Sequence, residues 1–260
     1  MSSTVGITIL FGSLVFLMIL RFPISFALGV ASLFTGLYLG IPFFNLFQKM
    51  ATGITSFTFM CVPFFIIMAQ IMTDGGISDR LTSFANVLVG RVRGGTALVN
   101  CLVSMFFGGI SGSSIADVSS IGSFLIPSMI KEGYDADYSI AVTCTSSVEG
   151  VIIPPSQNMI FYIVAAGSGL SISTMFMCGY LPGVLLTAAL MVTSFVIAVK
   201  KKYPVSESRS WKENIVIVRE SILGLVTILI VAVGIIAGVF TATEAGAIAA
   251  VYAFVITTFV

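Results

Sequence analysis

Two stretches of the chain place polar groups inside apolar sequence, and both carry the oxygen atoms that a small cation binds. The first stretch, Gly108–Asp117, reads GGISGSSIAD. Its backbone carbonyls and serine hydroxyls are ligands that a hard cation such as Na⁺ prefers. Asp117 adds a carboxylate, and placing a carboxylate at mid-membrane costs roughly 2.5–3.5 kcal/mol on insertion scales. That cost favours a function in ion or substrate binding.

Two structural explanations compete with this function. Gly109 and Ser113 have the small-xxx-small spacing that lets two helices approach closely. Asp117 would also serve as an N-cap or first-turn anion of a helix that begins near Ser114. The density of glycine argues against packing alone, because glycine weakens the helix that packing requires.

The second stretch, Thr143–Asn158, reads TCTSSVEGVIIPPSQN and contains the signals of a broken helix. A glycine and two consecutive prolines interrupt the helix, so nearby carbonyls lack their i+4 donors and can bind a cation. These carbonyls belong to Gly150, Ile152 and Pro155. Ser156, Gln157 and Asn158 then begin a second half-helix, whose N-terminal dipole favours an anionic group. A simple proline kink is the structural alternative.

Two further acids lie in similar surroundings. Glu149 has three open roles, as a cation ligand, as a partner of another chain, or as an acid that stays neutral in the membrane. Glu244, within Thr241–Gly246, is expected to cap a helix at the membrane interface. The chain has no histidine, and its four cysteines occur singly in apolar segments without metal-ligand spacing, so imidazole chemistry is excluded and a cysteine metal site is disfavoured.

The composition indicates what kind of protein positions these groups. The chain has 260 residues, of which 57% are hydrophobic and 9% are charged, and its mean hydropathy is +1.11. This composition predicts an all-α polytopic membrane protein. The net charge of +1 gives no indication of nucleic acid binding.

The first polar stretch lies between two short apolar arms, Thr96–Phe107 and Ile115–Ile130. Each arm has about 12 to 16 residues, fewer than the roughly 20 that a spanning helix needs. A non-helical turn at membrane depth survives only when it is buried in protein or lines a wet cavity. The sequence therefore predicts a re-entrant helical hairpin with its non-helical tip at Gly108–Ser114, near mid-membrane.

Apolar segments predict the N-terminal spans. Val5–Leu20 and Ile24–Gly40 are joined by a short turn and should form an antiparallel pair. Pro42–Met50 interleaves phenylalanines with polar residues and is expected to lie in the membrane interface. Ile54–Met72 is a third span that Pro63 kinks.

The rest of the chain alternates between interfacial and spanning segments. Asp74–Gly95 is expected to be an interfacial arm. Ala136–Ile153 enters the membrane, is broken at the proline pair and resumes over Met159–Ala166 as a second half-helix. A polar turn, Gly167–Ser173, and a solvated loop, Tyr203–Asn214, flank the next span. The later spans are Met175–Val199, Ile215–Phe240 and Ala242–Val260. The last one stops without a polar flank, so we expect the sequence to be part of a larger protein.

These elements divide the chain into five predicted parts. They are N-terminal scaffold helices with a kinked third span (1–74), a cytoplasmic interfacial arm (75–95), transport elements (96–173) that contain the re-entrant hairpin (96–131) and the broken helix (136–166), a long span with its loop (174–214), and the start of a second repeat (215–260).

Basic residues near span ends predict the orientation of the chain. If the N-terminus lies outside and the hairpin enters and leaves on the same side, all but one of the 12 lysines and arginines fall inside. The exception is Lys49. A full crossing by the hairpin would move Lys131 and every later basic residue outside, so the charges favour re-entry.

Four segments resemble the large, DctM-type membrane subunit of tripartite ATP-independent periplasmic (TRAP) transporters. They are GGISGSSIAD (108–117), LIPSMIKEGYD (125–135), SSVEGVIIPPS (146–156) and GVFTATEAGAIAAVYA (238–253). The resemblance covers the chain in order. It implies a secondary transporter of the ion transporter superfamily in the bacterial inner membrane that moves by an elevator mechanism. In that membrane, the orientation predicted from the basic residues places the N-terminus in the periplasm.

The resemblance also implies partners, a coupling ion and site residues. Such a subunit works with a small four-helix membrane subunit and a periplasmic binding protein that delivers an organic acid, and Na⁺ usually drives uptake. Carried onto this sequence, the first-repeat Na⁺ ligands are Ser111, Gly150, Ile152 and Pro155. Ser113 and Asp117 lie near the substrate, and Asn158 heads the half-helix that faces it.

Two departures from the family pattern matter. The chain contains one hairpin and one broken helix where similar proteins have two inverted repeats, so we expect residues 1–260 not to transport alone. Many members have isoleucine before the glycine of the broken helix and proline after it, whereas this chain has Glu149 and Val151. The substrate pocket is expected to differ accordingly.

Two other functions compete with this one. One is a Na⁺-coupled dicarboxylate or citrate symporter of the same superfamily that needs no binding protein. The other is a non-transporting scaffold or an intramembrane enzyme with Asp117 and Glu149 as an acid pair, although no nucleophile, metal cluster or phosphate loop accompanies them. The sequence leaves the substrate open among sialic acid, sugar acids and dicarboxylates.

Overall fold

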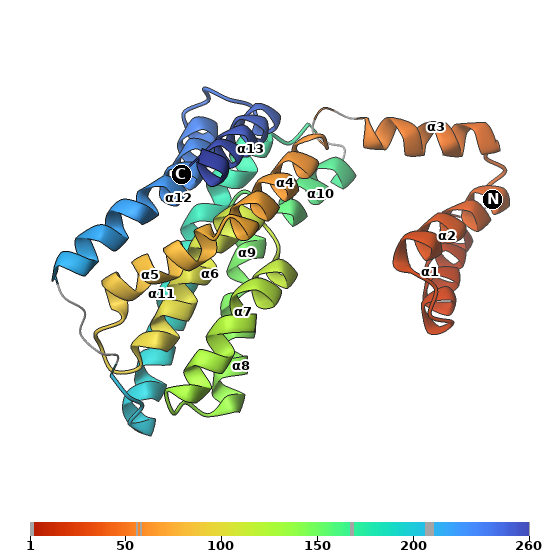
Figure 1. Cartoon of the computed structure of the whole chain (residues 1–260). Helices are drawn as coiled ribbons and strands as arrows, with labels where there is room; N and C mark the ends of the chain where they lie inside the picture. The colour runs from red at the N-terminus through yellow and green to blue at the C-terminus, as the bar shows by residue number, and fades with distance from the viewer. Residues whose placement is uncertain (1–2, 56, 58, 167–168, 206–210, 260) are drawn as a thin grey trace. The chain divides into compact units, whose positions relative to one another are not determined.

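The computed structural model describes residues 3–55, 57, 59–166, 169–205 and 211–259. Its regular elements in these ranges are thirteen helices, with one isolated bridge between Arg93 and Val205 (Figure 1). The helical class predicted from the composition is therefore confirmed. The chain forms two compact units, Met1–Ser56 and Phe57–Val260.

The first unit contains α1 (Ser3–Ile19), α2 (Ile24–Tyr38) and α3 (Phe43–Ile54). The short turn predicted an antiparallel pair, and α1 and α2 do pack against each other. Leu46 of α3 packs directly on Gly36 of α2, where a side chain would collide with it. Both α1 and α2 are apolar but shorter than the roughly 20 residues of a typical span.

The second unit begins with α4 (Cys61–Asp74) and α5 (Ile77–Val89), which meet at an angle of 73°. The predicted single span Ile54–Met72 with a kink at Pro63 is wrong, because Ile54 ends α3 and Pro63 lies in the first turn of α4. A proline is tolerated there, since the first N–H groups of a helix have no intrahelical partner. The bend occurs instead at Gly75–Gly76, where Gly76 has φ +71°.

The predicted hairpin forms from α6 (Gly95–Ser111) and α7 (Ser114–Lys131). Its tip is narrower than expected: Gly108–Ser111 are still helical, and only Gly112 and Ser113 lie between the helices. Gly112 has φ +61°, a left-handed conformation that glycine adopts without strain and that ends α6. The two arms pack against each other, as a helical hairpin requires.

The broken helix consists of α8 (Ala136–Ser146), α9 (Glu149–Ile152) and α10 (Gln157–Ala166). The structure adds a break that the sequence prediction missed, because Ala136–Ile153 is interrupted at Ser147–Val148. There, Ser147 Oγ donates to Cys144 O at 2.9 Å, and Gly150 N and Val151 N form tighter i−3 bonds. Serine hydroxyls compete for backbone carbonyls in this way and weaken helix interiors.

Three long helices complete the unit: α11 (Ile172–Lys201), α12 (Trp211–Ile236) and α13 (Ala242–Phe259). Each contains a segment long and apolar enough to cross a membrane, and the bent pair α4–α5 would add a fourth. The predicted solvated loop, Tyr203–Asn214, ends too late, because α12 already begins at Trp211. The predicted polar turn includes residues 167–168, and the predicted loop includes residues 206–210. Both of these segments lie outside the described residues.

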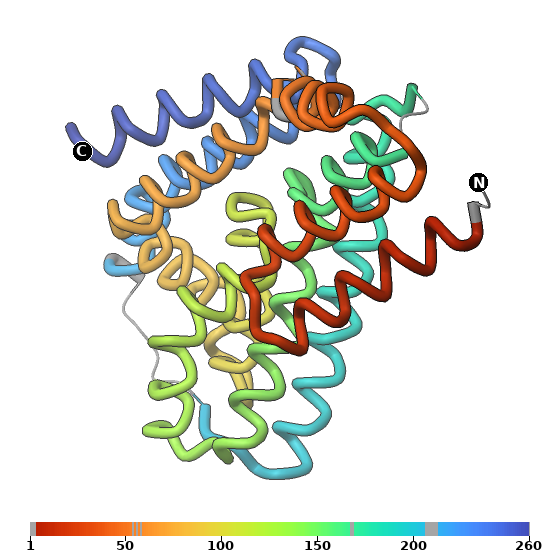
Figure 2. Tube along the Cα trace, turned by 90° about the vertical axis from the view of Figure 1, so that its right-hand side faces the viewer, coloured from red at the N-terminus to blue at the C-terminus, as the bar shows by residue number. Residues whose placement is uncertain are grey.

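We distinguish two groups of helices in the second unit, which meet where α5 and α4 pack against α6. In the first group, α4 lies beside α13 and α5 beside α12, although these pairs are far apart in sequence (Figures 1 and 2). In the second group, the hairpin and the broken helix pack together and against α11. An apolar cluster that includes Phe65, Met68 and Ile235 fills the first group, and Ile110 and Phe176 of the second group reach into it. The hairpin and the break, which carry the predicted site, therefore belong to one packed group.

Candidate functional site

The tip of the hairpin and the break in the α8–α10 helix lie directly against each other. A Cβ atom on Gly108 would lie 2.7 Å from Gly150 Cα, and one on Gly109 would lie 3.6 Å from Pro154 O. A Cβ atom on Gly112 would collide with Pro155 O. Glycines are needed at Gly108 and Gly112 because the two backbones touch. The structure thus brings together the two stretches that the sequence singled out.

Gln157 connects the two breaks by hydrogen bonds. Its backbone N–H donates to Gly112 O at 3.3 Å, and its side-chain amide donates to Ser111 O at 3.1 Å. Two carbonyls at the end of α6 are therefore satisfied by the start of α10. The sequence analysis placed Gln157 at the head of a half-helix but did not foresee this bridge, which depends on the tertiary arrangement.

Asp117 is completely buried in the first turn of α7. Ser111 Oγ donates to Asp117 Oδ1 at 2.7 Å, and Ser113 Oγ caps the helix by accepting from Ala116 N at 3.4 Å. The other carboxylate oxygen, Asp117 Oδ2, has no hydrogen-bond partner among the described residues, and a Cβ atom on Gly150 would lie 2.9 Å from it. Asp117 is a first-turn anion, as one structural alternative proposed, but it also presents an unsatisfied oxygen to the broken helix.

The carbonyls of the broken helix have different surroundings. Pro154 and Pro155 have no N–H, so the carbonyls of Gly150 and Val151 lose their i+4 donors. Val151 O instead accepts a hydrogen bond from Ser156 Oγ at 2.5 Å, whereas no side chain of the described residues donates to Gly150 O. Pro154 and Pro155 are joined by a cis peptide bond.

The carbonyls of Ile152 and Pro155, which were also predicted to bind a cation, lie against different parts of the structure. Ile152 O lies against Gly179 of α11, where a Cβ atom would be 2.5 Å from it, whereas Pro155 O lies against Gly112 of the hairpin tip. The structure therefore places Ser111, Asp117 and Gly150 together, with Pro155 beside the tip. In this conformation Ile152 O is turned toward α11.

Glu149 is a second completely buried acid, one residue before Gly150. Neither of its carboxyl oxygens has a hydrogen-bond partner among the described residues. Thr187 of α11 lies beside it, but the Thr187 hydroxyl donates to Gly183 O at 3.0 Å. The ion pair that the described residues form, Lys201 with Asp135, involves exposed groups at the end of α11. Two buried carboxyl groups therefore lie near each other without a basic neighbour.

Asn158 does not join this buried cluster, because it lies on an exposed face of α10. Ser113 is half-buried at the hairpin tip. Of the three predicted substrate residues, the structure places Ser113 and Asp117 at the tip and leaves Asn158 on the outer side of the half-helix.

A buried polar network that the sequence analysis did not assign joins the hairpin to α8. The Asn100 side-chain amide donates to Thr143 Oγ1 at 2.7 Å, and Ser104 Oγ lies 3.0 Å from Ser146 Oγ. These four residues are 0–1% exposed. Asn100, a polar residue within an apolar arm, was the signal in the sequence that could have revealed the network. The network fixes the first arm of the hairpin to the broken helix.

A further contact ties the base of the hairpin group to the end of α11. Asp135 pairs with Lys201 and accepts a hydrogen bond from Tyr203 Oη at 2.8 Å. These two donors, with Lys201 contributing more, hold the pKa of Asp135 below its usual range. The rings of Tyr134, Tyr138 and Tyr203 lie 4.5–6.2 Å apart beside this pair. We call these five residues the base clamp.

Comparison with known proteins identifies the family. The model of the family described as "Tripartite ATP-independent periplasmic transporter, DctM component" matches residues 11–260. The chain belongs to the DctM family. The match extends over both groups of helices and includes the hairpin tip, the break and the base clamp. The resemblance stated from four sequence segments is thereby confirmed.

Three relatives of this DctM-family chain illustrate the match. A protein named YgiK from Salmonella typhimurium is 40% identical over 250 residues, which are 95% of this chain and 57% of that protein. The C4-dicarboxylate TRAP transporter large permease protein DctM of Rhodobacter capsulatus is 38% identical, covering 97% of this chain and 60% of its own length. The sialic acid TRAP transporter permease protein SiaT of Haemophilus influenzae is 35% identical, covering 100% of this chain and 42% of its own length. The DctM-family chain thus spans at most about 60% of the length of these curated relatives.

Proposed function

We propose that this chain is part of the large membrane subunit of a Na⁺-coupled secondary transporter that imports an organic acid. The observation that carries the proposal is the contact between the hairpin tip and the broken helix. It buries Asp117 and Ser111 against Gly150 and leaves Asp117 Oδ2 without a partner. Two opposed helix breaks at membrane depth are the arrangement in which secondary transporters bind ions and substrate. The names of relatives refer to a C4-dicarboxylate and to sialic acid, which supports an organic acid as the substrate class.

The proposed Na⁺ ligands are Ser111, Gly150, Ile152 and Pro155. Gly150 O supports this assignment because it has lost its i+4 donor, and Ser111 Oγ supports it because it lies at the same contact. Ile152 O is turned toward Gly179 here, so binding would require that carbonyl to rotate toward the tip. Asp117 and Ser113 are the proposed substrate contacts at the tip, with Asn158 approaching from the exposed side of α10.

The packing of the second unit supports movement of the site as one body. Interhelical hydrogen bonds run within each group: Ser221 Oγ to Arg80 O and Thr243 Oγ1 to Phe57 O in the first, and the Asn100 network in the second. Contact between the groups is made by apolar side chains, including the rings of Phe84 and Phe106, whose centroids are 5.9 Å apart. An apolar surface can slide without breaking hydrogen bonds, so we propose that α6–α11 move together in an elevator mechanism.

The proposed transporter has three components. The large subunit assembles with a small four-helix membrane subunit and receives the acid from a periplasmic binding protein. It lies in the bacterial inner membrane with its N-terminus on the periplasmic side. Membership in a permease family and three helices of spanning length support this location.

Uptake into proteoliposomes tests the proposal. The complete natural protein, reconstituted with its small subunit, is given a labelled organic acid, with or without the binding protein and with or without an inward Na⁺ gradient. We expect uptake only when both the binding protein and the Na⁺ gradient are present. Uptake without the binding protein would instead identify a binding-protein-independent symporter. Absence of uptake for dicarboxylates, sialic acid and sugar acids under all conditions would refute the transport of these acids.

A further inference from the structure

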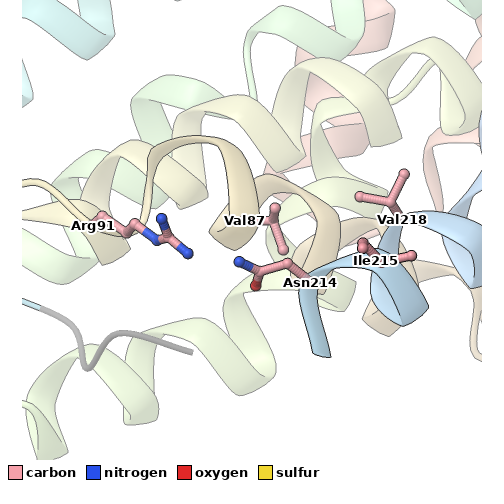
Figure 3. Close-up of a pocket in the computed structure, with 5 residues that line it drawn as sticks. All are labelled: Val87, Arg91, Asn214, Ile215 and Val218. Carbon is pink, nitrogen blue, oxygen red and sulfur yellow. The ribbon is translucent and has the colours of Figure 1, made fainter. Parts of the chain in front are cut away.

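A pocket of about 280 Å³ lies between the end of α5 and the first turns of α12 (Figure 3). It lies apart from the hairpin tip and from the broken helix. Of the five described residues that line it, three are apolar. The lining residues are Val87, Arg91, Asn214, Ile215 and Val218.

Both polar residues of the pocket carry N–H donors, and the Asn214 amide also carries an acceptor oxygen. Figure 3 shows the Arg91 guanidinium and the Asn214 amide directed toward one another across a gap. Asn214 is only 8% exposed and Arg91 is exposed, and among the described residues no side-chain hydrogen bond or ion pair joins either of them to a neighbour. The adjacent Glu213 is exposed and is not among the described residues that line the pocket. The guanidinium of Arg91 and the amide N–H of Asn214 can both donate to an anion that lies between them.

The position of the pocket along α12 indicates where this anion lies in the membrane. Residues 213–236 form a candidate span, so Asn214 and Arg91 lie at its end, where lipid headgroups are found. Below the pocket, α12 exposes apolar side chains at intervals of seven residues, which therefore share one face. They are Ile215, Ile222, Leu229 and Ile236. From Ile215 to Leu229 the helix rises about 21 Å, which exceeds the roughly 15 Å depth of one leaflet of hydrocarbon.

We infer that this pocket binds an anionic phospholipid, with the phosphate between Arg91 and Asn214 and an acyl chain along the exposed apolar face of α12. Phosphate oxygens accept two parallel hydrogen bonds from the planar fork of a guanidinium, and they also accept from an amide N–H. The apolar lining and the apolar face that continues from it favour a lipid over a soluble anion, which would leave Ile215 and Ile222 uncovered. An arginine near the membrane surface increases the affinity for an anionic lipid by about fivefold.

Lipid binding to the complete natural protein tests this inference. The purified protein in detergent is titrated with phosphatidylglycerol, and bound lipid is counted by native mass spectrometry. Arg91→Gln is expected to weaken binding of the tightest lipid about fivefold. Asn214→Asp should weaken it to a similar extent, because the new carboxylate pairs with Arg91 and occupies the space of the phosphate. The matched control is Arg219→Gln, which removes the same charge from an exposed residue of α12 outside the pocket and should change binding less than about twofold.

Other outcomes would overturn the inference. Equal losses in Arg91→Gln and Arg219→Gln would mean that the lipid responds only to overall charge. Full competition by inorganic phosphate would assign the pocket to a soluble anion, and loss of a protein subunit in Arg91→Gln would assign it to a protein contact. Each variant is compared at equal thermal stability and as a single peak in size-exclusion chromatography. If Asn214→Asp fails that comparison, Asn214→Leu replaces it and should weaken binding in the same direction.

Discussion

Asp117 and Glu149 are both completely buried acids in the same group of helices, yet their surroundings differ. Asp117 receives a hydrogen bond from Ser111, and its free oxygen is directed at the broken helix, where a cation would lie. Glu149 receives none from the described residues and adjoins a threonine whose proton is already donated elsewhere. The enclosing helices leave Glu149 no exposed surface, so a basic residue from another part of the protein cannot reach it unless they move. These differences predict that neutralising Glu149 changes stability, whereas neutralising Asp117 changes transport.

Replacing Glu149 by glutamine should raise the thermal stability of the complete protein. An unpaired buried acid costs about 1–3 kcal/mol or more, and the amide removes its charge at nearly the same size. The measurement is thermal unfolding in detergent. The exposed Glu220→Gln is the control and should remain within about 0.5 kcal/mol of the unsubstituted protein. A lower stability of Glu149→Gln, together with loss of stabilisation by Na⁺, would show instead that Glu149 is a cation ligand.

Replacing Asp117 by asparagine should affect substrate transport more than the Na⁺ requirement. The change keeps the shape and the contact with Ser111 but removes the charge at the hairpin tip.

Replacing Pro154 and Pro155 together by alanine should affect the Na⁺ requirement more than substrate transport, because the restored N–H groups would satisfy Gly150 O and Val151 O. Transport by the double variant should need more Na⁺, while the affinity of the binding protein for the acid stays the same. If the double variant has an unchanged Na⁺ dependence, the break is a structural kink and does not bind Na⁺.

At the scale of helices, the site depends on how closely two backbones approach. Gly108 lies against Gly150, and Gly112 combines a left-handed conformation with a contact to Pro155 O. The predicted small-xxx-small pair, Gly109 and Ser113, has less to do with this approach, since Gly109 has ordinary spacing to Pro154 O and Ser113 caps α7. The glycines at the tip therefore allow the two helix breaks to pack closely, and they also allow the turn itself.

Gly108→Ala should destabilise the protein and impair uptake, because the new methyl group would lie 2.7 Å from Gly150 Cα, a backbone atom that cannot rotate away. We expect a loss of about 1–3 kcal/mol, typical of overpacking. Gly29→Ala in α2 is the control, since nothing lies within 4 Å of the added atom. It should be neutral or stabilising by up to about 1 kcal/mol. Equal effects of the two substitutions in thermal unfolding would contradict the close contact.

The base clamp should weaken in acid. Lys201 and Tyr203 lower the pKa of Asp135 in the folded protein, so the clamp contributes stability above the usual aspartate range and loses it as pH falls through the lowered value. Asp135→Asn should therefore lower stability near neutral pH and reduce the difference between neutral and acidic conditions. Thermal unfolding of both proteins between neutral pH and about pH 3 measures this. Parallel pH profiles for the two proteins would mean that Asp135 does not stabilise the fold.

At the scale of the molecule, the contacts within each group of helices in the second unit differ from the contacts between the two groups. Among the described residues, the side-chain hydrogen bonds between helices lie inside each group, and apolar side chains lie between the groups. If the hairpin group moves as one body, a covalent link between the groups should block uptake and a link inside the hairpin group should not.

Cysteine pairs test this difference in the complete transporter after its native cysteines are replaced. A pair at Phe84 and Phe106 joins α5 to α6 across the groups, and a pair at Ser104 and Ser146 joins α6 to α8 within one group. Cross-linking the first pair should abolish uptake and reduction should restore it. The second pair should retain most of the activity when cross-linked. Uptake that persists with the first pair cross-linked would exclude sliding between α5 and α6.

The sequence by itself determined the helical class, the order of most helices, the hairpin and the broken helix. These follow from local causes: long apolar runs form helices, prolines remove N–H donors, and glycines permit the tip. The local sequence pattern gave a wrong prediction at Pro63, where it indicated a kinked span. A proline in the first turn of a helix cannot be told from one in its middle until the start of the helix is known. The pattern also failed at Ser147–Val148, where serine hydroxyls compete with the backbone.

Only the tertiary structure decided which polar groups meet. Nothing in the spacing of Gly108 and Gly150 predicts that their backbones touch, that Gln157 bridges to Ser111 O and Gly112 O, or that Glu149 is enclosed without a partner. The pocket at Arg91 and Asn214 likewise joins residues more than 120 positions apart. The physical reason is that contacts between distant segments depend on how whole helices pack, and packing reflects the summed shape of many side chains, not the identity of any one.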